Sequence, residues 1–475
     1  MPLLWDTHGT LRRVALYAGS LTSARVSIMG YTAYVFQDRQ TVERLWKQPS
    51  LSSSIFLYMY SMKFLFGARE QLMSALRIDD SGPFPQPHPD SKIASHNRLH
   101  YIIHDSLARG LSGPGLDALM DSYMKGVSRR IHDLQVTEDW TEMDDFAKLL
   151  KSLGGESVIE AIFGPKMLDL NPGFVDSLWG FDSKLPKFAR GLPSWVMPGA
   201  HRNRQRLVEQ IMSWYQYARQ HSDESKLEQD ADGDSVWGSA MMRDRQKTIL
   251  QVEKQDDDAM ARLDLGLAWA AVANAIPSAT LSAFHIFKDP ELLVRIRNAV
   301  DKHLGSRSFA ELDIKELTKE PLLSSVYAET LRLYIIVYAT VTSPHEDASL
   351  GRWLLPKNSL GVLNSGLSHM DTEFWNTKNG NYPVETFWAE RFCVDPGDSS
   401  SGPIRSECRK SMNLPDPVRS KDGKPFISTR GLEGSWFPYG GGRIICPGRV
   451  FAKSLMIFTW ALLANEFDVE FYTSK

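Results

Sequence analysis

The sequence has little cysteine, no excess of either charge, and no apolar run at its start. Its 475 residues include three cysteines, Cys393, Cys408 and Cys446, which are too few for a disulfide framework. The 54 Lys and Arg residues nearly balance the 57 Asp and Glu residues, so we expect no nucleic-acid partner. Arg12 and Arg13 stand where an apolar segment would be needed, so the sequence predicts neither a secretory signal nor an N-terminal membrane anchor.

One internal segment lacks charge and is long enough to cross a bilayer. Leu265–Phe287 contains no Asp, Glu, Lys or Arg over 23 residues. It carries several polar residues, including Asn274, and a proline at Pro277, and alanine outnumbers Leu and Ile. We therefore favour a long helix buried inside the protein over a membrane span. The shorter apolar segment Ile55–Phe66 belongs either to a core or to a membrane surface.

Apolar residues spaced three and four apart predict a mostly helical chain. Helices are expected through most of residues 90–220, over Leu322–Tyr334 and over 447–464, and short strands and turns follow Pro344. We find no internal repeat and no clean linker. Residues 1–475 are therefore expected to form a single domain, mainly α with small β-sheets.

Three further segments carry distinct local patterns. Alternation over Ala24–Phe36 predicts a β-hairpin, and alternation over Phe467–Phe471 predicts a closing strand. Acidic residues crowd both ends of Ser222–Asp258, so we expect that segment to be mostly a solvated connector.

The strongest chemical signal is the sequence YGGGRIICPGRVFA, residues 439–452. Three consecutive glycines permit a tight turn and let the backbone approach a flat cofactor without Cβ clashes. Cys446 follows, just before a predicted helix, where backbone N–H groups and the helix N-terminus stabilise a thiolate. A shielded thiolate at such a turn is what a haem-thiolate iron requires. A buried structural thiol is the alternative interpretation.

This segment resembles the haem-binding loop of the cytochrome P450 family. The family has an aromatic residue, a glycine four residues before the cysteine, and then Cys-x-Gly-x-x-x-Ala, which Ala452 completes here. The usual basic residue two places before the cysteine is Ile444 in this chain, with Arg443 one place earlier. The resemblance implies haem b with Cys446 as the axial ligand of its iron. The implied cofactor-binding residues are Cys446, Tyr439, Gly442, Gly448 and Arg443.

Two further motifs stand at the family's spacing. Glu329 and Arg332 lie three residues apart on a predicted helix and therefore share one face, where the guanidinium can brace the carboxylate. Arg391 lies in the segment WAERF, before the cysteine. The resemblance implies that these three residues form a structural triad, in a fold that holds the haem between a long central helix and the helix after the cysteine loop.

The uncharged helix departs from the family pattern. Where the family has an acid and an alcohol that deliver protons during oxygen activation, this chain has Ala273 and Asn274, followed by Pro277, which is expected to kink the helix. Asn274 either caps a carbonyl freed by the kink or acts as a catalytic amide beside the iron. The same departure resembles one branch of the family, the sterol 7α- and 12α-hydroxylases and prostacyclin synthase.

The resemblance implies a monooxygenase that inserts one oxygen atom of O2 into an apolar small molecule, such as a sterol, a terpenoid or another secondary metabolite. Electrons would come from NADPH through the NADPH-cytochrome P450 reductase. A reductase-independent isomerase or dehydratase acting on a peroxide is one alternative, and a non-catalytic haem-binding protein is another. Contact with a membrane surface and association with the endoplasmic reticulum are implied by resemblance, whereas the lack of an anchor or signal leaves a cytoplasmic location open.

Overall fold

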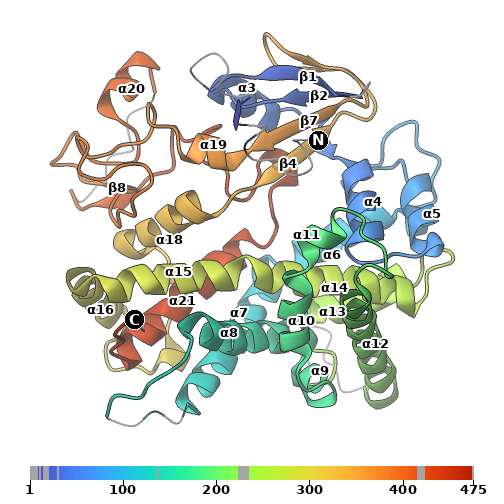
Figure 1. The fold of residues 1–475 in the computed structure, drawn as a ribbon, viewed down its shortest axis with the longest axis horizontal. Helices are drawn as coiled ribbons and strands as arrows, with labels where there is room; N and C mark the ends of the chain where they lie inside the picture. The colour runs from blue at the N-terminus through green and yellow to red at the C-terminus, as the bar shows by residue number, and fades with distance from the viewer. Residues whose placement is uncertain are drawn as a thin grey trace. The chain divides into compact units, whose positions relative to one another are not determined.

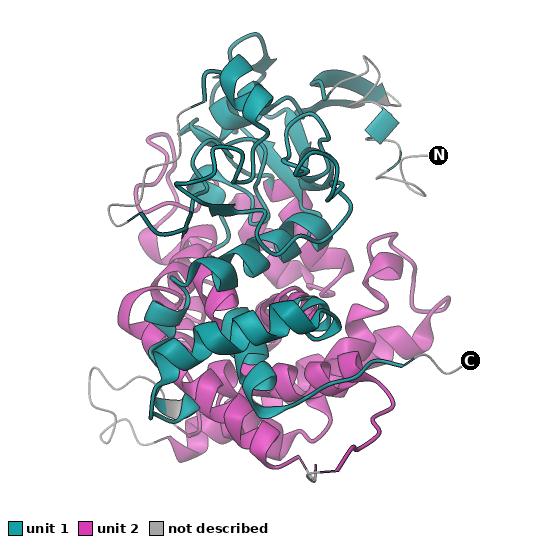
Figure 2. Cartoon of the chain, turned by 90° about the vertical axis from the view of Figure 1, so that its left-hand side faces the viewer, with its two compact units in different colours: residues 1–54, 281–446, 456–475 teal, residues 55–280, 447–455 magenta. Residues whose placement is uncertain are grey.

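The structure is a computed structural model that describes residues 9, 12–13, 21–28, 31–134, 136, 139–222, 235–414 and 423–472. It is mainly α-helical with small β-sheets, which confirms the predicted fold class (Figure 1). Two compact units are distinguished in Figure 2. Unit 1 comprises Met1–Ser54, Leu281–Cys446 and Met456–Lys475, and unit 2 comprises Ile55–Thr280 and Pro447–Leu455. The chain passes repeatedly between the units, and that residues 1–475 form one domain stays a prediction.

Unit 1 contains all the described strands. They are β1 (Ala24–Ile28), β2 (Tyr31–Val35), β3 (Ser52–Ser53), β4 (Tyr338–Thr342), β5 (Ala348–Ser349), β6 (Leu354–Leu355), β7 (Leu360–Asn364), β8 (Cys393–Val394) and β9 (Phe426–Ile427). Its helices are α3 (Arg39–Trp46), α16 (Pro290–Leu304), α17 (Ile314–Leu317), α18 (Pro321–Tyr334), α19 (Ser365–His369) and α20 (Ser406–Ser411), with the short 3-10 helices η3 (Phe309–Glu311) and η4 (Gly442–Ile444).

The main sheet has the strand order β1-β2-β7-β4-β3, of which Figure 1 labels the first four strands. β2 and β7 run parallel, and the other neighbours run antiparallel. β1 and β2 pair from Ala24 opposite Val35 to Ile28 opposite Tyr31, as the predicted hairpin requires. Its turn, residues 29–30, lies outside the described residues.

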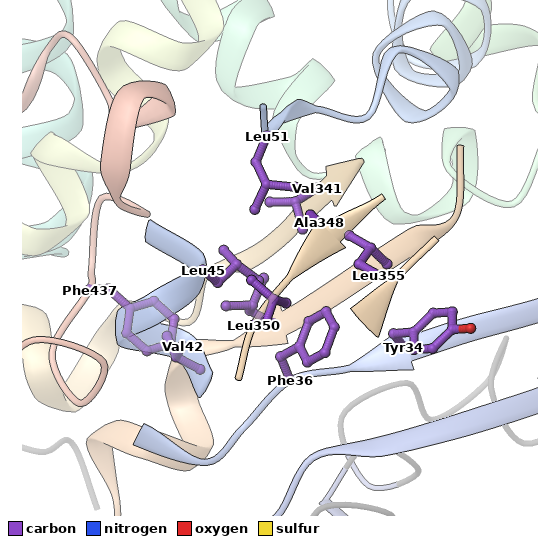
Figure 3. Packing of buried hydrophobic residues seen from close by; sticks show 11 residues of the cluster. Tyr34, Phe36, Val42, Leu45, Leu51, Val341, Ala348, Leu350, Leu355 and Phe437 are labelled. Atoms are coloured by element: carbon purple, nitrogen blue, oxygen red, sulfur yellow. The ribbon is translucent and has the colours of Figure 1, made fainter. Parts of the chain in front are cut away.

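A buried apolar cluster joins this sheet to α3 (Figure 3). Asp38 caps α3 by accepting the amide hydrogen of Thr41 at 3.0 Å, and Val42 and Leu45 turn inward from the helix. Phe437, from the chain just before the cysteine loop, inserts its ring into the same cluster. The start of that loop is therefore held by the core of the sheet.

Unit 2 is helical throughout its described elements. They are α4 (Ile55–Phe64), α5 (Glu70–Ile78), η1 (Ser95–Asn97), α6 (Leu99–Gly110), α7 (Gly113–His132), α8 (Phe146–Phe163), α9 (Pro165–Leu170), α10 (Phe174–Asp182), α11 (Leu185–Phe188), α12 (Pro198–His221), α13 (Ala240–Ile249) and α14 (Asp257–Ala273). Two more helices, α15 (Ala275–Lys288) and α21 (Arg449–Glu466), supply residues to both units.

The uncharged segment forms the end of α14 and nearly all of α15. Among the described residues, Asp257–Lys288 is the one helical stretch long and apolar enough to cross a membrane, and half of its most apolar window is buried in the protein. The helix is interrupted at Asn274, three residues before Pro277. Because proline has no N–H, Pro277 cannot donate to the carbonyl of Ala273, which accounts for the break.

The prediction of a solvated connector over Ser222–Asp258 is wrong for its second half. Residues 240–249 form α13, and Arg245 is buried there. Its Nη2 donates to Oδ1 of Asp264 at 2.6 Å, and Tyr215 donates to the other carboxylate oxygen at 2.6 Å. The many charged residues of the segment suggested a surface loop. The prediction failed because Arg245 is buried against Asp264, which lies outside the segment. Residues 223–234 lie outside the described residues.

The predicted closing strand over Phe467–Phe471 is also wrong. The described chain after α21 forms no strand there. Instead, the carbonyl of Phe467 and the carboxylate of Asp468 accept hydrogen bonds from Arg297 of α16, at 2.9 and 2.8 Å. Alternation indicated a strand, but side-chain contacts with a helix take the place of a neighbouring strand.

Candidate haem-thiolate site

The cysteine loop is a closed turn held by its own backbone. The amide of Cys446 donates to the carbonyl of Tyr439 at 3.0 Å, and the amide of Gly440 donates to the carbonyl of Phe437 at 3.0 Å. Gly440 and Gly442 have φ angles of 72° and 58°, in the left-handed region that favours glycine. Cys446 thus emerges from a turn that other residues would strain.

Two of the three glycines are required by their contact with α3. A Cβ atom on Gly441 would lie 2.5 Å from the indole ring of Trp46. A Cβ atom on Gly442 would lie 2.5 Å from the carbonyl oxygen of Trp46. These glycines let the loop lie against Trp46, and the approach of a flat cofactor to them stays a prediction.

The aromatic residue of the loop is tied to α18. The hydroxyl of Tyr327 donates to the hydroxyl of Tyr439 at 2.9 Å, and burial raises the pKa of Tyr439 well above its usual value. Sequence reasoning did not single out Tyr327. A tyrosine on a buried helix needs a partner for its hydroxyl, and that signal predicts a polar neighbour without saying which one.

Only one of the three cysteines has an exposed thiol. Cys446 is exposed, whereas Cys408 is buried and Cys393 is partly buried. Burial raises the pKa of Cys393 to about 11, and it also raises the pKa of Cys408. A thiolate ligand needs an accessible thiol that can lose its proton. Cys446 fits that requirement best.

The donor set also fits a prosthetic group better than a bare metal ion. Within the described residues no three His, Cys, Asp or Glu side chains gather around one point. A metal held near Cys446 by this part of the chain would therefore bring its other ligands with it, as haem iron does. The exposed thiol and the turn that presents it are compatible with that group.

The remaining predicted cofactor residues lie on either side of Cys446. Arg443 is exposed in η4, and its guanidinium donates to the carbonyl of Pro49 at 3.2 Å. Gly448 follows Cys446 by two residues, and its carbonyl accepts the amide hydrogen of Ala452 at 2.8 Å in the first turn of α21. That Arg443 binds the cofactor stays a prediction.

The structure brings the three predicted triad residues together in unit 1, all fully buried. Glu329 accepts from Arg332 Nε at 2.7 Å and Nη2 at 2.8 Å, and from Arg391 Nε at 2.9 Å. Arg391 also donates to the carbonyls of Asn376 and Thr386. Burial lowers the pKa of Arg391, and the charge of Glu329 opposes that effect. One carboxylate therefore serves two guanidinium groups that reach separate loops.

Asn274 lies in unit 2, at the break between α14 and α15. Its side chain is exposed, as is that of Ala270 one turn earlier, whereas Val272 and Ala275 are buried. The Asn274 carbonyl accepts the hydroxyl of Ser278 at 2.7 Å. The carbonyl freed by Pro277 is instead that of Ala273, so this bond does not replace the cap that the sequence left as an alternative, and Asn274 lies on an exposed face of the helix.

Comparison with known proteins agrees with these features. The family model of cytochrome P450 matches residues 174–475. The chain is 29% identical to cytochrome P450 monooxygenase efuG of Hormonema carpetanum, over 99% of this chain and 82% of that protein. It is 28% identical to cytochrome P450 monooxygenase fsoE of Humicola fuscoatra, over 98% and 79%.

Weaker similarity extends to sterol hydroxylases and to a solved structure. The chain is 25% identical to cholesterol 7-alpha-monooxygenase of Cricetulus griseus, over 63% of this chain and 53% of that protein. The crystal structure of the cytochrome P450 CYP102L1 matches with a TM-score of 0.61 at 14% identity, over 97% of this chain and 88% of that one, which shows the fold. The family model covers more than half of the sequence, so the chain belongs to the cytochrome P450 family and is an oxidoreductase of the monooxygenase type.

Proposed function

We propose that the protein binds haem b through the thiolate of Cys446 and hydroxylates an apolar small molecule, such as a sterol, a terpenoid or another secondary metabolite. One oxygen atom of O2 enters a C–H bond and the other leaves as water. NADPH supplies two electrons through a cytochrome P450 reductase, and NADPH and solvent supply the two protons. The observation that carries this proposal is the exposed Cys446 thiol at the end of a braced glycine turn.

Haem, when bound, supplies the activation of dioxygen. The residues of the chain would bind the haem and position the loops around it. The Cys446 thiolate would hold the haem iron and donate electron density to it, and the Tyr439 carbonyl fixes the backbone of Cys446. Glu329, Arg332 and Arg391 hold the loops of unit 1 in place. The choice of a sterol-like substrate is supported by the similarity to a cholesterol 7-alpha-monooxygenase.

Asn274 is proposed to hold the water that delivers protons to oxygen. The adjacent Ala273 offers no carboxylate, and an exposed amide both donates and accepts hydrogen bonds. We expect Asn274→Ala to slow product formation several-fold and to raise the share of reducing equivalents lost as hydrogen peroxide. Asn274→Thr should keep part of the coupling because its hydroxyl can hold the same water. NADPH consumption, product and peroxide are measured together.

Ser278→Ala is the matched control, because it removes a hydroxyl one turn further along, which donates to the backbone carbonyl of Asn274 at 2.7 Å. Its coupling should stay at the wild-type level. Incubation under labelled dioxygen then separates the alternatives. Label-free product made from a peroxide without NADPH would favour the isomerase, and no turnover with any reductase would favour a non-catalytic haem protein.

We further propose contact with an anionic lipid surface through the connection from α11 to α12, consistent with association with the endoplasmic reticulum. Residues 183–208 contain six Lys and Arg residues and no Asp or Glu. Trp195 within them is 82% exposed. The neighbouring apolar helix α4 exposes Phe56 to 70%, and its Tyr60 donates to the carbonyl of Ala189 at 2.7 Å. Exposed aromatic and basic side chains together suit a lipid interface.

We expect the purified protein to sediment with vesicles of equal parts phosphatidylcholine and phosphatidylserine, and less with phosphatidylcholine alone. Trp195→Ser should weaken binding to these vesicles. The double variant Lys184→Gln with Lys187→Gln should weaken it by about 2 kcal/mol, because each basic residue near an anionic surface contributes about 1 kcal/mol. Trp140→Ser is the matched control, because Trp140 is 70% exposed but lies beside acidic residues. Equal binding by all of these variants would contradict the proposal.

A further inference from the structure

His369 lies at the end of α19 with no exposed surface, and it contacts the chain that leads into the cysteine loop. The amide of Phe437 donates a hydrogen bond to its Nε2 atom at 3.3 Å. The two rings meet edge to face, with centroids 5.8 Å apart. A backbone amide of the loop segment thus depends on a side chain for its hydrogen bond.

The backbone of His369 contacts the triad on the other side. Its carbonyl accepts from Nη1 of Arg332 at 2.8 Å. The two remaining donors of that guanidinium, Nε and Nη2, bind Glu329. His369 is therefore bonded to the triad through its main chain and to the loop through its ring.

The ring of His369 stays neutral at ordinary pH. Burial, and then the positive charge of Arg332, lower the pKa of His369 to about 3. A neutral ring has one acceptor nitrogen, and the amide of Phe437 uses it, so the ring proton resides on Nδ1. The Nε2 atom of His369 can therefore accept the Phe437 amide hydrogen throughout the ordinary pH range.

Phe437 is linked to Cys446 through the backbone hydrogen bonds of the loop. Its ring lies in the core of the sheet against Trp46, with centroids 6.0 Å apart. Its carbonyl accepts the amide of Gly440, and the carbonyl of Tyr439 accepts the amide of Cys446. Between Phe437 and Cys446 two more side chains anchor the chain: the hydroxyl of Tyr439 bonds Tyr327 of α18, and Arg443 donates to the carbonyl of Pro49.

We propose that His369 is a positioning residue that couples the Glu329–Arg332–Arg391 triad to the Cys446 loop, through the hydrogen bond from the Phe437 amide. The coupling between the triad and the loop is argued from the contacts within unit 1 alone. Its effect on haem ligation also rests on the proposed function of Cys446. It explains how an ion cluster far from Cys446 in the sequence bears on thiolate ligation.

Two amide variants test the proposal with nearly equal chemistry. In His369→Gln the side-chain amide reaches the place of Nε2 and keeps an acceptor there. In His369→Asn the same amide is one bond shorter and cannot reach the Phe437 amide. We expect Gln to preserve slow hydrogen exchange at the Phe437 amide, and Asn to raise the exchange rate about fivefold, the effect of one ordinary hydrogen bond.

The second measurement is the reduced carbon-monoxide complex during incubation in mild urea. We expect the Asn variant to lose the red-shifted Soret band of thiolate ligation several-fold faster than wild type, and the Gln variant to resemble wild type. His285→Leu is the control. It removes another histidine of unit 1, whose Nε2 is paired with the hydroxyl of Tyr334 at 2.6 Å and not with the loop.

Equal behaviour of the Gln and Asn variants in both measurements would overturn the coupling, because the ring would then matter only for packing. A wild-type protein without the thiolate band would instead overturn the assignment of Cys446. In that case exchange at the Phe437 amide still decides whether His369 anchors the loop.

Discussion

Replacing Cys446 with alanine is expected to abolish the red-shifted Soret band of the reduced carbon-monoxide complex and to reduce monooxygenase activity below detection. The band requires a thiolate on the iron. The other two cysteines cannot take over, because Cys408 is buried and burial raises the pKa of Cys393 to about 11. Both thiols therefore keep their protons at neutral pH. Difference spectra of purified protein measure the outcome.

Cys393→Ser and Cys408→Ala are the matched controls for this experiment. Each removes one thiol from unit 1 without touching the turn between Tyr439 and Cys446. We expect both to keep the thiolate band, although Cys408→Ala leaves a small gap beside Met412. The assignment of Cys446 is wrong if its alanine variant keeps the band, or if one of the controls alone loses it.

The residues of the site were predictable where spacing along the chain decides geometry. Glu329 and Arg332 meet because residues three positions apart on a helix share a face. Pro277 breaks its helix because it lacks an N–H. The turn before Cys446 follows from glycines that accept positive φ angles. Each of these inferences needs only local backbone rules and no knowledge of distant partners.

The contacts that anchor the loop were not predictable in this way. Tyr327 and Tyr439 are separated by 112 residues, and His369 and Phe437 by 68. No periodicity says which buried hydroxyl or imidazole will meet which part of a loop. The same limit explains the error over α13, where Arg245 is buried against Asp264 from the next helix. Acidic composition describes a segment but not its partners.

The break at Asn274 shows how local and distant contributions combine. The sequence indicated the kink and left two roles for the amide. Ser278 binds the carbonyl of Asn274, whereas the carbonyl freed by Pro277 is that of Ala273, so both roles of the Asn274 amide stay predictions. Asn274 is exposed, whereas Val272 and Ala275 beside it are buried. This exposure favours a role of the amide toward a ligand, which the Asn274 variants test.

Loss of one member of the triad is expected to yield haem-free, aggregated protein instead of a weak enzyme. Arg391→Ala leaves Glu329 with one guanidinium partner, and it removes the hydrogen bonds that Arg391 donates to the carbonyls of Asn376, Pro383 and Thr386. Glu329→Ala leaves two guanidinium groups buried without a counter-charge. Removing one partner of a buried ion pair costs about 3–5 kcal/mol. That is a large share of the roughly 5–15 kcal/mol that stabilises a typical domain.

Arg391→Lys separates charge from geometry within the same site. Lysine keeps the positive charge beside Glu329 but has no planar fork, so it cannot serve the carboxylate and the carbonyls together. We expect its haem content and melting temperature to lie between those of wild type and Arg391→Ala. Glu390→Ala is the control, because the neighbouring Glu390 pairs with Arg295 on the surface and exposed pairs contribute little. Haem loading per protein and the melting temperature are measured for each variant. Wild-type values in both Arg391→Ala and Glu329→Ala would show that the unit 1 loops do not depend on the triad.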